Sequence, residues 1–379
     1  MTIRMLMVGA ALALWGCNGV IDGADGLGNS GPSAPRCGRS ICGATGELAA
    51  ATAFPRLTHA QWENSVRDIL RLDTASGLSG TFEPDTRVSY FDNNIRALRV
   101  SSDLWTDYQG AAESLAAAVT ADGAALARLL PSQLPTDVTE RARAVVRNLG
   151  RRVYRRPLSD TEVDEHLVLF EQGRSHYPEM DAFDGGVRVL LEAFLQSPHF
   201  IYRVELGQSR NGDTVQLSDF EIASRLAYMI WNTTPDDELL DEADAARLHT
   251  ADQIAVQAAR LMNDPRGQAM LERFHAQLFN WDLFRNLNKD PSEFPLYYAG
   301  VGQDMYEEAR LFVEHVVLEE NGDLAELLTA PYTFVNADLG AIYGIDDNLD
   351  QSFSLASFDP TKQPERGGLL TQLGFLASH

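Results

Sequence analysis

The sequence predicts an all-α protein, in which two to three helical bundles follow a signal peptide and a flexible tether in series. The main observation is a capping signature, Ser or Thr followed three residues later by Glu or Gln, that occurs four times. Such a pair satisfies two backbone amides at a helix start. Apolar residues follow each signature at helical spacing, and strand-like alternation is scarce.

The four signatures predict four helix starts. In the first three, Leu precedes the cap and an apolar residue follows the Glu or Gln, as in a hydrophobic staple. Further helices are predicted over 102–119, 136–156, 184–196, 265–281, 303–320 and 336–343, and a long loop over 81–94. The four cap pairs are Thr58/Gln61, Ser159/Glu162, Ser218/Glu221 and Thr250/Gln253.

The first residues have the pattern of an export signal. Arg4 precedes an apolar stretch over 5–14, and Cys17 follows that stretch directly. This predicts a lipoprotein signal peptide whose thiol at Cys17 is lipidated. Two alternatives remain: cleavage after the A-x-A at 11–13, favoured by the bulky Trp15, and a retained signal anchor. The apolar stretch is short for a membrane-spanning helix, which needs about 20 residues.

The cysteine count favours lipidation. The chain has three cysteines, and an odd one in an exported protein needs an explanation. Lipidation of Cys17 leaves Cys37 and Cys42, which we expect to form a disulfide in an oxidising compartment. No C-x-x-C-H occurs, so covalent c-type haem is excluded from this chain, and no other cofactor is predicted.

Composition shifts and predicted helix groups suggest six segments. Residues 1–16 are the lipoprotein signal peptide, and 17–53, rich in Gly, Ala and Ser, are the tether. Helical domains are then expected over 54–130, 131–207, 208–300 and 301–379.

The chain is strongly acidic. Its net charge of −23 argues against binding nucleic acid or an anionic lipid surface. A well-solvated acidic surface is the simplest interpretation. Attraction to a basic partner or to cations is the functional alternative.

Several long motifs occur in a fixed order along the chain. They lie at 56–58, 64–70 and 91–94; at 150–158; at 195–205, 223–228, 231–232 and 235–240; and at 332–336, 343–344 and 366–372. Together they resemble a bacterial cell-envelope family built of consecutive helical domains of unknown function, often associated with planctomycete-type cytochrome c domains. The resemblance covers about residues 54–379.

The resemblance implies a cell-envelope protein that faces the periplasm or the cell exterior, with envelope or cytochrome partners. It implies no activity. The chain has no attached cytochrome domain, and relatives continue into a further segment and a final domain, so we expect the fourth domain to be truncated.

Residues between Arg225 and Asp237 form the most interesting polar group. Arg225, Trp231 and Asp236 collect at a predicted helix end and the next turn. One interpretation is a capped helix junction with a buried Arg–Asp pair. The other is a pocket wall, where Trp231 stacks on a sugar ring and Asp236 binds its hydroxyls.

Other polar residues allow two interpretations each. Arg203 and Glu205 form a local ion pair or face a ligand, and Asn336 caps a helix or lines a site. The doublets Arg151-Arg152 and Arg155-Arg156 favour a helix C-terminus, with a polyanion site as the alternative.

Metal binding has weak candidates. Glu272 and His275 form an E-x-x-H on a predicted helix, but a di-iron bundle needs a second such motif, which the chain lacks. Glu308, Glu314 and His315 lie on a later predicted helix. Common zinc-hydrolase, α/β-hydrolase, P-loop and dinucleotide-binding motifs are absent from the sequence.

Three functions are compatible with these patterns. The first is a lipid-anchored partner or scaffold in an extracytoplasmic assembly with redox links. The second is an enzyme or binder acting on polysaccharides or other polymers, and the third is a metal-dependent redox enzyme. Convergence of Glu205, Asp236 and Asn336 with Trp231 in a pocket would favour the second. Helix capping and pairing with arginines would favour the first.

Overall fold

The computed structural model describes residues 54–207, 209–211, 214–345 and 348–378. The predictions on the signal peptide, the tether, Cys17, Cys37 and Cys42 lie outside the described residues. Within the described ranges, helices dominate and the strands form two small sheets of two strands each. The predicted all-α class is therefore confirmed. No helix in these ranges is long and apolar enough to cross a membrane.

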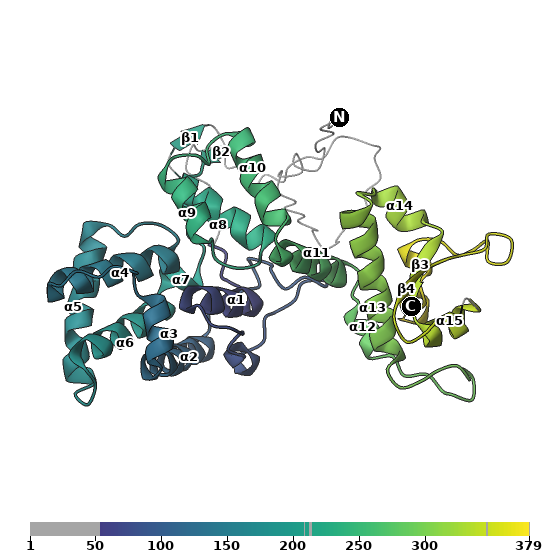
Figure 1. Ribbon diagram of the computed structural model, residues 1–379, viewed down its shortest axis with the longest axis horizontal. Coiled ribbons are helices and arrows are strands. Elements are labelled where there is room, and N and C mark those ends of the chain that lie inside the picture. Colours follow the sequence, from purple (N-terminus) through teal and green to yellow (C-terminus); the bar gives the residue numbers. More distant parts are fainter. Residues whose placement is uncertain (1–53, 208, 212–213, 346–347, 379) are drawn as a thin grey trace, which may run out of the picture.

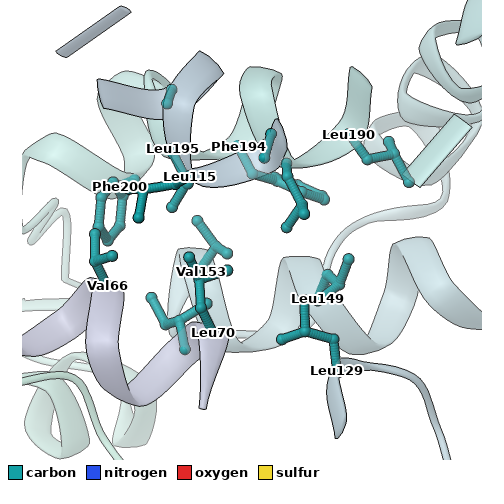
Figure 2. Packing of buried hydrophobic residues seen from close by; sticks show 14 of the residues in the cluster. Val66, Leu70, Leu115, Leu129, Leu149, Val153, Leu190, Phe194, Leu195 and Phe200 are labelled. Carbon is teal, nitrogen blue, oxygen red and sulfur yellow. The ribbon is translucent and has the colours of Figure 1, made fainter. Parts of the chain in front are cut away.

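The first part of the described chain is a helical body with one core. Its elements are α1 (His59–Leu70), η2 (Leu78–Thr81), α2 (Ser102–Ala121), α3 (Gly123–Leu129), α4 (Val138–Tyr154), α5 (Asp160–His176), α6 (Ala182–Leu195) and α7 (Pro198–Ile201). Buried side chains from Leu57 to Ile201 form a single cluster, which Tyr228 joins from a later helix. Figure 2 shows residues of α1, α4 and α6 meeting in this core.

A smaller second core follows. It begins after a hairpin of β1 (Ser209–Asn211) and β2 (Thr214–Gln216), which pair antiparallel. The helices are α8 (Asp219–Ile230), α9 (Asp237–Asp244) and α10 (Ala251–Met262). Trp231, Leu239 and Leu261 are buried among them.

The third core occupies the C-terminal part of the described chain. Its elements are α11 (Pro265–Leu278), α12 (Asp282–Arg285), α13 (Val301–Glu314), the π-helical turn η3 (His315–Glu319), α14 (Leu324–Thr329), β3 (Tyr332–Val335), α15 (Ala337–Tyr343), β4 (Ser354–Ser357), η4 (Leu369–Thr371) and α16 (Leu373–Ser378). Strands β3 and β4 pair antiparallel, with Tyr332 opposite Ser357. In Figure 1, α11 lies between the other elements of this region and the first two regions.

All four predicted capping boxes are present. In each, the Ser or Thr oxygen accepts from the N3 amide and the N3 side chain accepts from the cap amide. Several predicted helix ends differ from the structure by one to three residues. The helix predicted to 281 ends at Leu278, and the one predicted over 303–320 begins at Val301 and ends in a π turn.

Direct contacts join the first core to the second. The Ser65 and Tyr228 hydroxyls are 2.9 Å apart, and Thr233 Oγ1 donates to Asp68 Oδ2 at 2.8 Å. The Asn64 amide donates to the Asn232 carbonyl at 3.2 Å. Because these contacts link residues far apart in the sequence, they set how α1 lies against the turn between α8 and α9.

A connecting loop, residues 82–101, reaches the third region from the first. Arg87 Nη1 donates to Asp282 at 3.2 Å, and Asp92 forms an ion pair with Arg273. The rings of Phe91 and Phe274 lie 6.1 Å apart. The connecting loop thus contacts α11 and α12 directly.

Candidate functional site

Glu205 and Arg225 form an ion pair. Arg225 donates to Glu205 through Nε at 2.9 Å and through Nη2 at 2.6 Å. The hydrogen bonds that Arg225 donates to Glu205 raise the pKa of Arg225 against the opposing effect of burial. The Arg–Asp pair predicted at this helix junction therefore does not include Arg225, whose partner is a glutamate and whose side chain is 57% exposed.

Arg203 does not form the hydrogen-bonded ion pair with Glu205 that one interpretation of the sequence predicts. The guanidinium lies 5.5 Å from the centroid of the Tyr228 ring, and its buried Nε has no hydrogen-bond partner among the described residues. Burial lowers the pKa of Arg203 despite the nearby charge of Glu205. The hydrogen-bonded pair in this region is Glu205 with Arg225, rather than the predicted Arg203 with Glu205.

Trp231 is buried at the end of α8. Its indole N–H donates to the Leu261 carbonyl at 2.8 Å, and the Arg266 guanidinium lies 3.4 Å from the ring centroid. The side chain is 3% exposed. The Arg266 guanidinium thus occupies one face of the ring, where the alternative interpretation of the sequence placed a sugar.

Asp236 is the N-cap of α9. Its carboxylate accepts from the Leu239 amide at 2.9 Å and from Arg260 at 2.8 and 3.0 Å. The expected capping role is confirmed, and the arginine partner is Arg260, 24 residues later.

Asp237 accepts two hydrogen bonds from Arg152, at 3.1 and 2.9 Å. Burial opposes ionisation of Asp237, but the hydrogen bond and charge of Arg152 outweigh it, so the pKa of Asp237 is lowered. Arg151 pairs with Asp241 at 2.6 Å. The arginine doublet at the end of α4 therefore holds the second core through α9.

Asn336 is the N-cap of α15, as the capping interpretation predicts. Its carbonyl oxygen accepts from the Leu339 amide at 2.9 Å, and its amide donates to Asp304 Oδ2 at 3.0 Å. The Tyr298 hydroxyl donates to the same oxygen at 2.6 Å, and burial together with this bond raises the pKa of Tyr298. Both polar atoms of the Asn336 side chain are therefore used in structural contacts.

The side chains considered as metal ligands make separate contacts in the structure. Glu272 accepts from the Tyr306 hydroxyl at 2.9 Å, while His275 Nδ1 lies 2.9 Å from the Leu271 carbonyl. Burial lowers the pKa of His275. His315 contacts Glu319 at 2.5 Å. Across the ranges that the structure describes, no three His, Cys, Asp or Glu side chains form a group that could hold a metal ion.

A cavity of about 290 Å³ lies at the junction of α1, the end of α4, the turn before α9 and the start of α11. Charged side chains dominate its lining. The sequence singled out Arg152, Asp236 and Asp237, but it did not indicate that Arg67, Asp68, Arg71 and Arg266 lie beside them, because that proximity arises from the fold. The lining contains Arg67, Arg71, Arg152 and Arg266, with Asp68, Asp236 and Asp237.

Three family models match successive parts of the chain. Residues 56–121 match "Protein of unknown function (DUF1587)", 141–205 match "Protein of unknown function (DUF1595)" and 217–345 match "Protein of unknown function (DUF1592)". The chain is a serial array of domains of unknown function. No curated protein and no solved structure matches it.

The three family segments of this serial array all contribute to the cavity. Arg67 lies in the first segment, Arg152 in the second, and Asp236 and Arg266 in the third. The first two segments share one hydrophobic core. The cavity therefore depends on the serial arrangement, because no single segment supplies all of its charged groups.

Proposed function

We propose that this chain is a lipid-anchored partner or scaffold subunit of an assembly in the bacterial cell envelope. Lipidated Cys17 holds it at the membrane, and the helical array faces the periplasm or the cell exterior. The observation that supports this proposal is the fate of the polar side chains that a polymer-binding site would need. Glu205, Asp236 and Asn336 are engaged in ion pairs and helix caps.

The same contacts weigh against a polysaccharide site built on these residues. A sugar platform needs an accessible aromatic face, and Trp231 is covered by Arg266. A sugar-binding carboxylate needs free acceptor capacity, and Asp236 accepts from Arg260 and from the Leu239 amide. These side chains stabilise the array, which suits a rigid scaffold.

The proposed partner is basic and redox-active. The net charge of −23 favours association with a basic protein, because complementary charge steers encounter. The redox link rests on the resemblance to envelope proteins associated with cytochrome c domains. The chain itself has no covalent haem motif, so the partner would supply the redox group.

The anchor is tested by detergent phase partitioning of the full chain expressed in a bacterial host. Wild type is expected in the detergent phase and the Cys17→Ser variant in the aqueous phase, since lipid adds apolar surface. Cys37→Ser is the matched control, because it removes a thiol but leaves the lipidation site. An unchanged distribution of Cys17→Ser would contradict the anchor.

The partner is tested by mild-detergent extraction from the native envelope, followed by light scattering and haem staining across a size-exclusion column. We expect a complex larger than the monomer, a haem-stained component, and dissociation as salt rises. A complex without haem would refute the redox link alone. A monomer at low salt would refute the scaffold proposal.

A further inference from the structure

The charged cavity at the meeting point of the three family segments has an excess of hydrogen-bond donors. Its three aspartates are already satisfied by the protein. Asp68 accepts from Arg67 Nε at 2.7 Å and from Thr233 at 2.8 Å. Asp236 is bound by Arg260 and the Leu239 amide, and Asp237 by Arg152.

The arginines, by contrast, have unused donors. Arg152 donates to Asp237 through Nε and Nη2, but its buried Nη1 has no hydrogen-bond partner in the described part of the chain. Arg67 donates to Asp68 through Nε, and the Arg266 side chain donates to Asp264 through Nε and Nη2. Guanidinium donors of Arg67 and Arg266 that no acceptor among the described residues uses can bind the oxygens of an anion in the cavity.

The cavity also has an apolar side and a neutral hydroxyl. Ile69, Leu72 and Pro235 contribute aliphatic surface, and Thr234 contributes a hydroxyl whose contact with the Arg152 carbonyl is long, at 3.4 Å. Small-molecule sites typically combine apolar walls with a few polar groups and range upward from about 300 Å³. A volume of about 290 Å³ suits a small molecule rather than a large cofactor.

We propose that this cavity binds a small organic oxyanion, whose carboxylate or phosphate oxygens accept from Arg67 and Arg266 near the charge of Arg152 and whose apolar part faces Leu72 and Pro235. Guanidinium groups recognise planar and tetrahedral oxyanions through paired N–H donors. The site goes beyond the scaffold function, because it requires neither the lipid anchor nor a protein partner.

Calorimetric titration of the full chain carrying Cys17→Ser tests the site. The probes are D-glucuronate, D-glucose and inorganic phosphate, and the first two differ in one carboxylate. We expect one glucuronate or phosphate per chain, with affinity that falls as salt rises, and no binding of glucose. Preference between the two anions distinguishes a carboxylate ligand from a phosphate ligand. Absence of binding by both anions, or equal binding of glucose and glucuronate, would overturn the proposal.

Variants locate the binding. Arg67→Gln is expected to weaken anion binding at least tenfold, because it removes a cation from the cavity. Arg143→Gln is the matched control: Arg143 is a partly exposed arginine of α4 that pairs with Asp164 and does not line the cavity. Circular dichroism verifies folding, and Arg71→Gln, at a more exposed lining position, replaces Arg67→Gln if that variant unfolds. Wild-type affinity in a folded cavity variant would refute the assignment.

Discussion

Glu308 lies fully buried in the third core. One carboxyl oxygen accepts from Thr333 at 2.7 Å and from Tyr343 at 2.5 Å, and the other has no partner among the described residues. Burial raises the pKa of Glu308 to about 7, against the lowering effect of the two hydrogen bonds and of the Arg366 charge. Near neutral pH, a substantial fraction of molecules therefore keeps a proton on this carboxyl that an exposed glutamate would have released.

The raised pKa of Glu308 makes the protein less stable as the pH rises. The protonated form stabilises the fold fully below the unfolded pKa of about 4.3, and this contribution is lost as pH rises through the folded pKa of about 7. The loss is on the order of 3 kcal/mol between pH 5 and 8. In urea unfolding, Glu308→Gln is expected to remove this decline, since Gln resembles the neutral acid. The exposed Glu113→Gln serves as control, and a wild-type decline in Glu308→Gln would assign it to another group.

Adjacent arginines at the end of α4 have very different surroundings. Arg155 is 4% exposed, and its guanidinium donates to the carbonyls of His199, Phe200 and Tyr202. Arg156 pairs with Glu162 at the surface, at 2.7 Å. The sequence presents both as members of one basic run, and burial alone separates their roles.

Alanine at these two positions tests the difference. Arg155→Ala leaves several buried carbonyls without donors and is expected to lower the free energy of unfolding by about 3–5 kcal/mol. Arg156→Ala, the matched control, is expected to cost about 0–1 kcal/mol because its ion pair is partly solvated. Chemical denaturation measures both. Equal effects would show that the Arg155 carbonyl contacts contribute little.

Contacts between residues close in the sequence could be predicted at the candidate site, whereas contacts between distant residues could not. Capping by Asp236 and Asn336 could be predicted, because a cap bonds an amide three residues away. Their charged partners, Arg260 and Asp304, could not be predicted, because the tertiary fold brings them close to the caps. The cavity was missed for the same reason, as its arginines come from three separate segments.

At the scale of elements, α5 and α6 approach each other through glycines. A Cβ built at Gly173 would lie 2.3 Å from the Gly186 nitrogen and 2.4 Å from the Gly185 carbonyl carbon. Such distances forbid a side chain without separation of the helices. The close crossing therefore requires glycine at this position of α5.

Gly173→Ala is expected to destabilise the protein by about 1–3 kcal/mol, the usual range for overpacking. Gly110→Ala is the matched control on the exposed face of α2, where an added Cβ meets nothing within 4 Å. That change is expected to stabilise by about 0.5–1 kcal/mol through helix propensity. Thermal unfolding compares the two, and destabilisation by Gly110→Ala would contradict the packing argument.

Helix starts could be predicted better than the C-terminal elements. The capping boxes act within four residues, and all four matched the structure. Strands β3 and β4 escaped prediction because each is four residues long and their pairing spans the intervening α15. The π turn after α13 likewise has no local sequence signal that we recognise.

At the scale of the whole molecule, the first and third cores are separate clusters. One runs from Leu57 to Ile201 with Tyr228, and the other from Trp281 to Phe375. We expect two calorimetric transitions. Leu149→Ala should lower the free energy of unfolding of the first core by about 2–5 kcal/mol, and so shift only its transition. Trp281→Ala should lower that of the third core by about 3–5 kcal/mol. A single transition shifted by both variants would contradict independent cores.

The connecting loop has a consequence for biosynthesis. Asp92 meets Arg273 across a sequence separation of 181 residues. At synthesis rates of about 5–20 residues per second, roughly 10–40 seconds pass between the two residues. During that interval Phe91 has no Phe274 to contact. The emerging chain thus exposes the aromatic side chain of Phe91 without its α11 partner until α11 has been made.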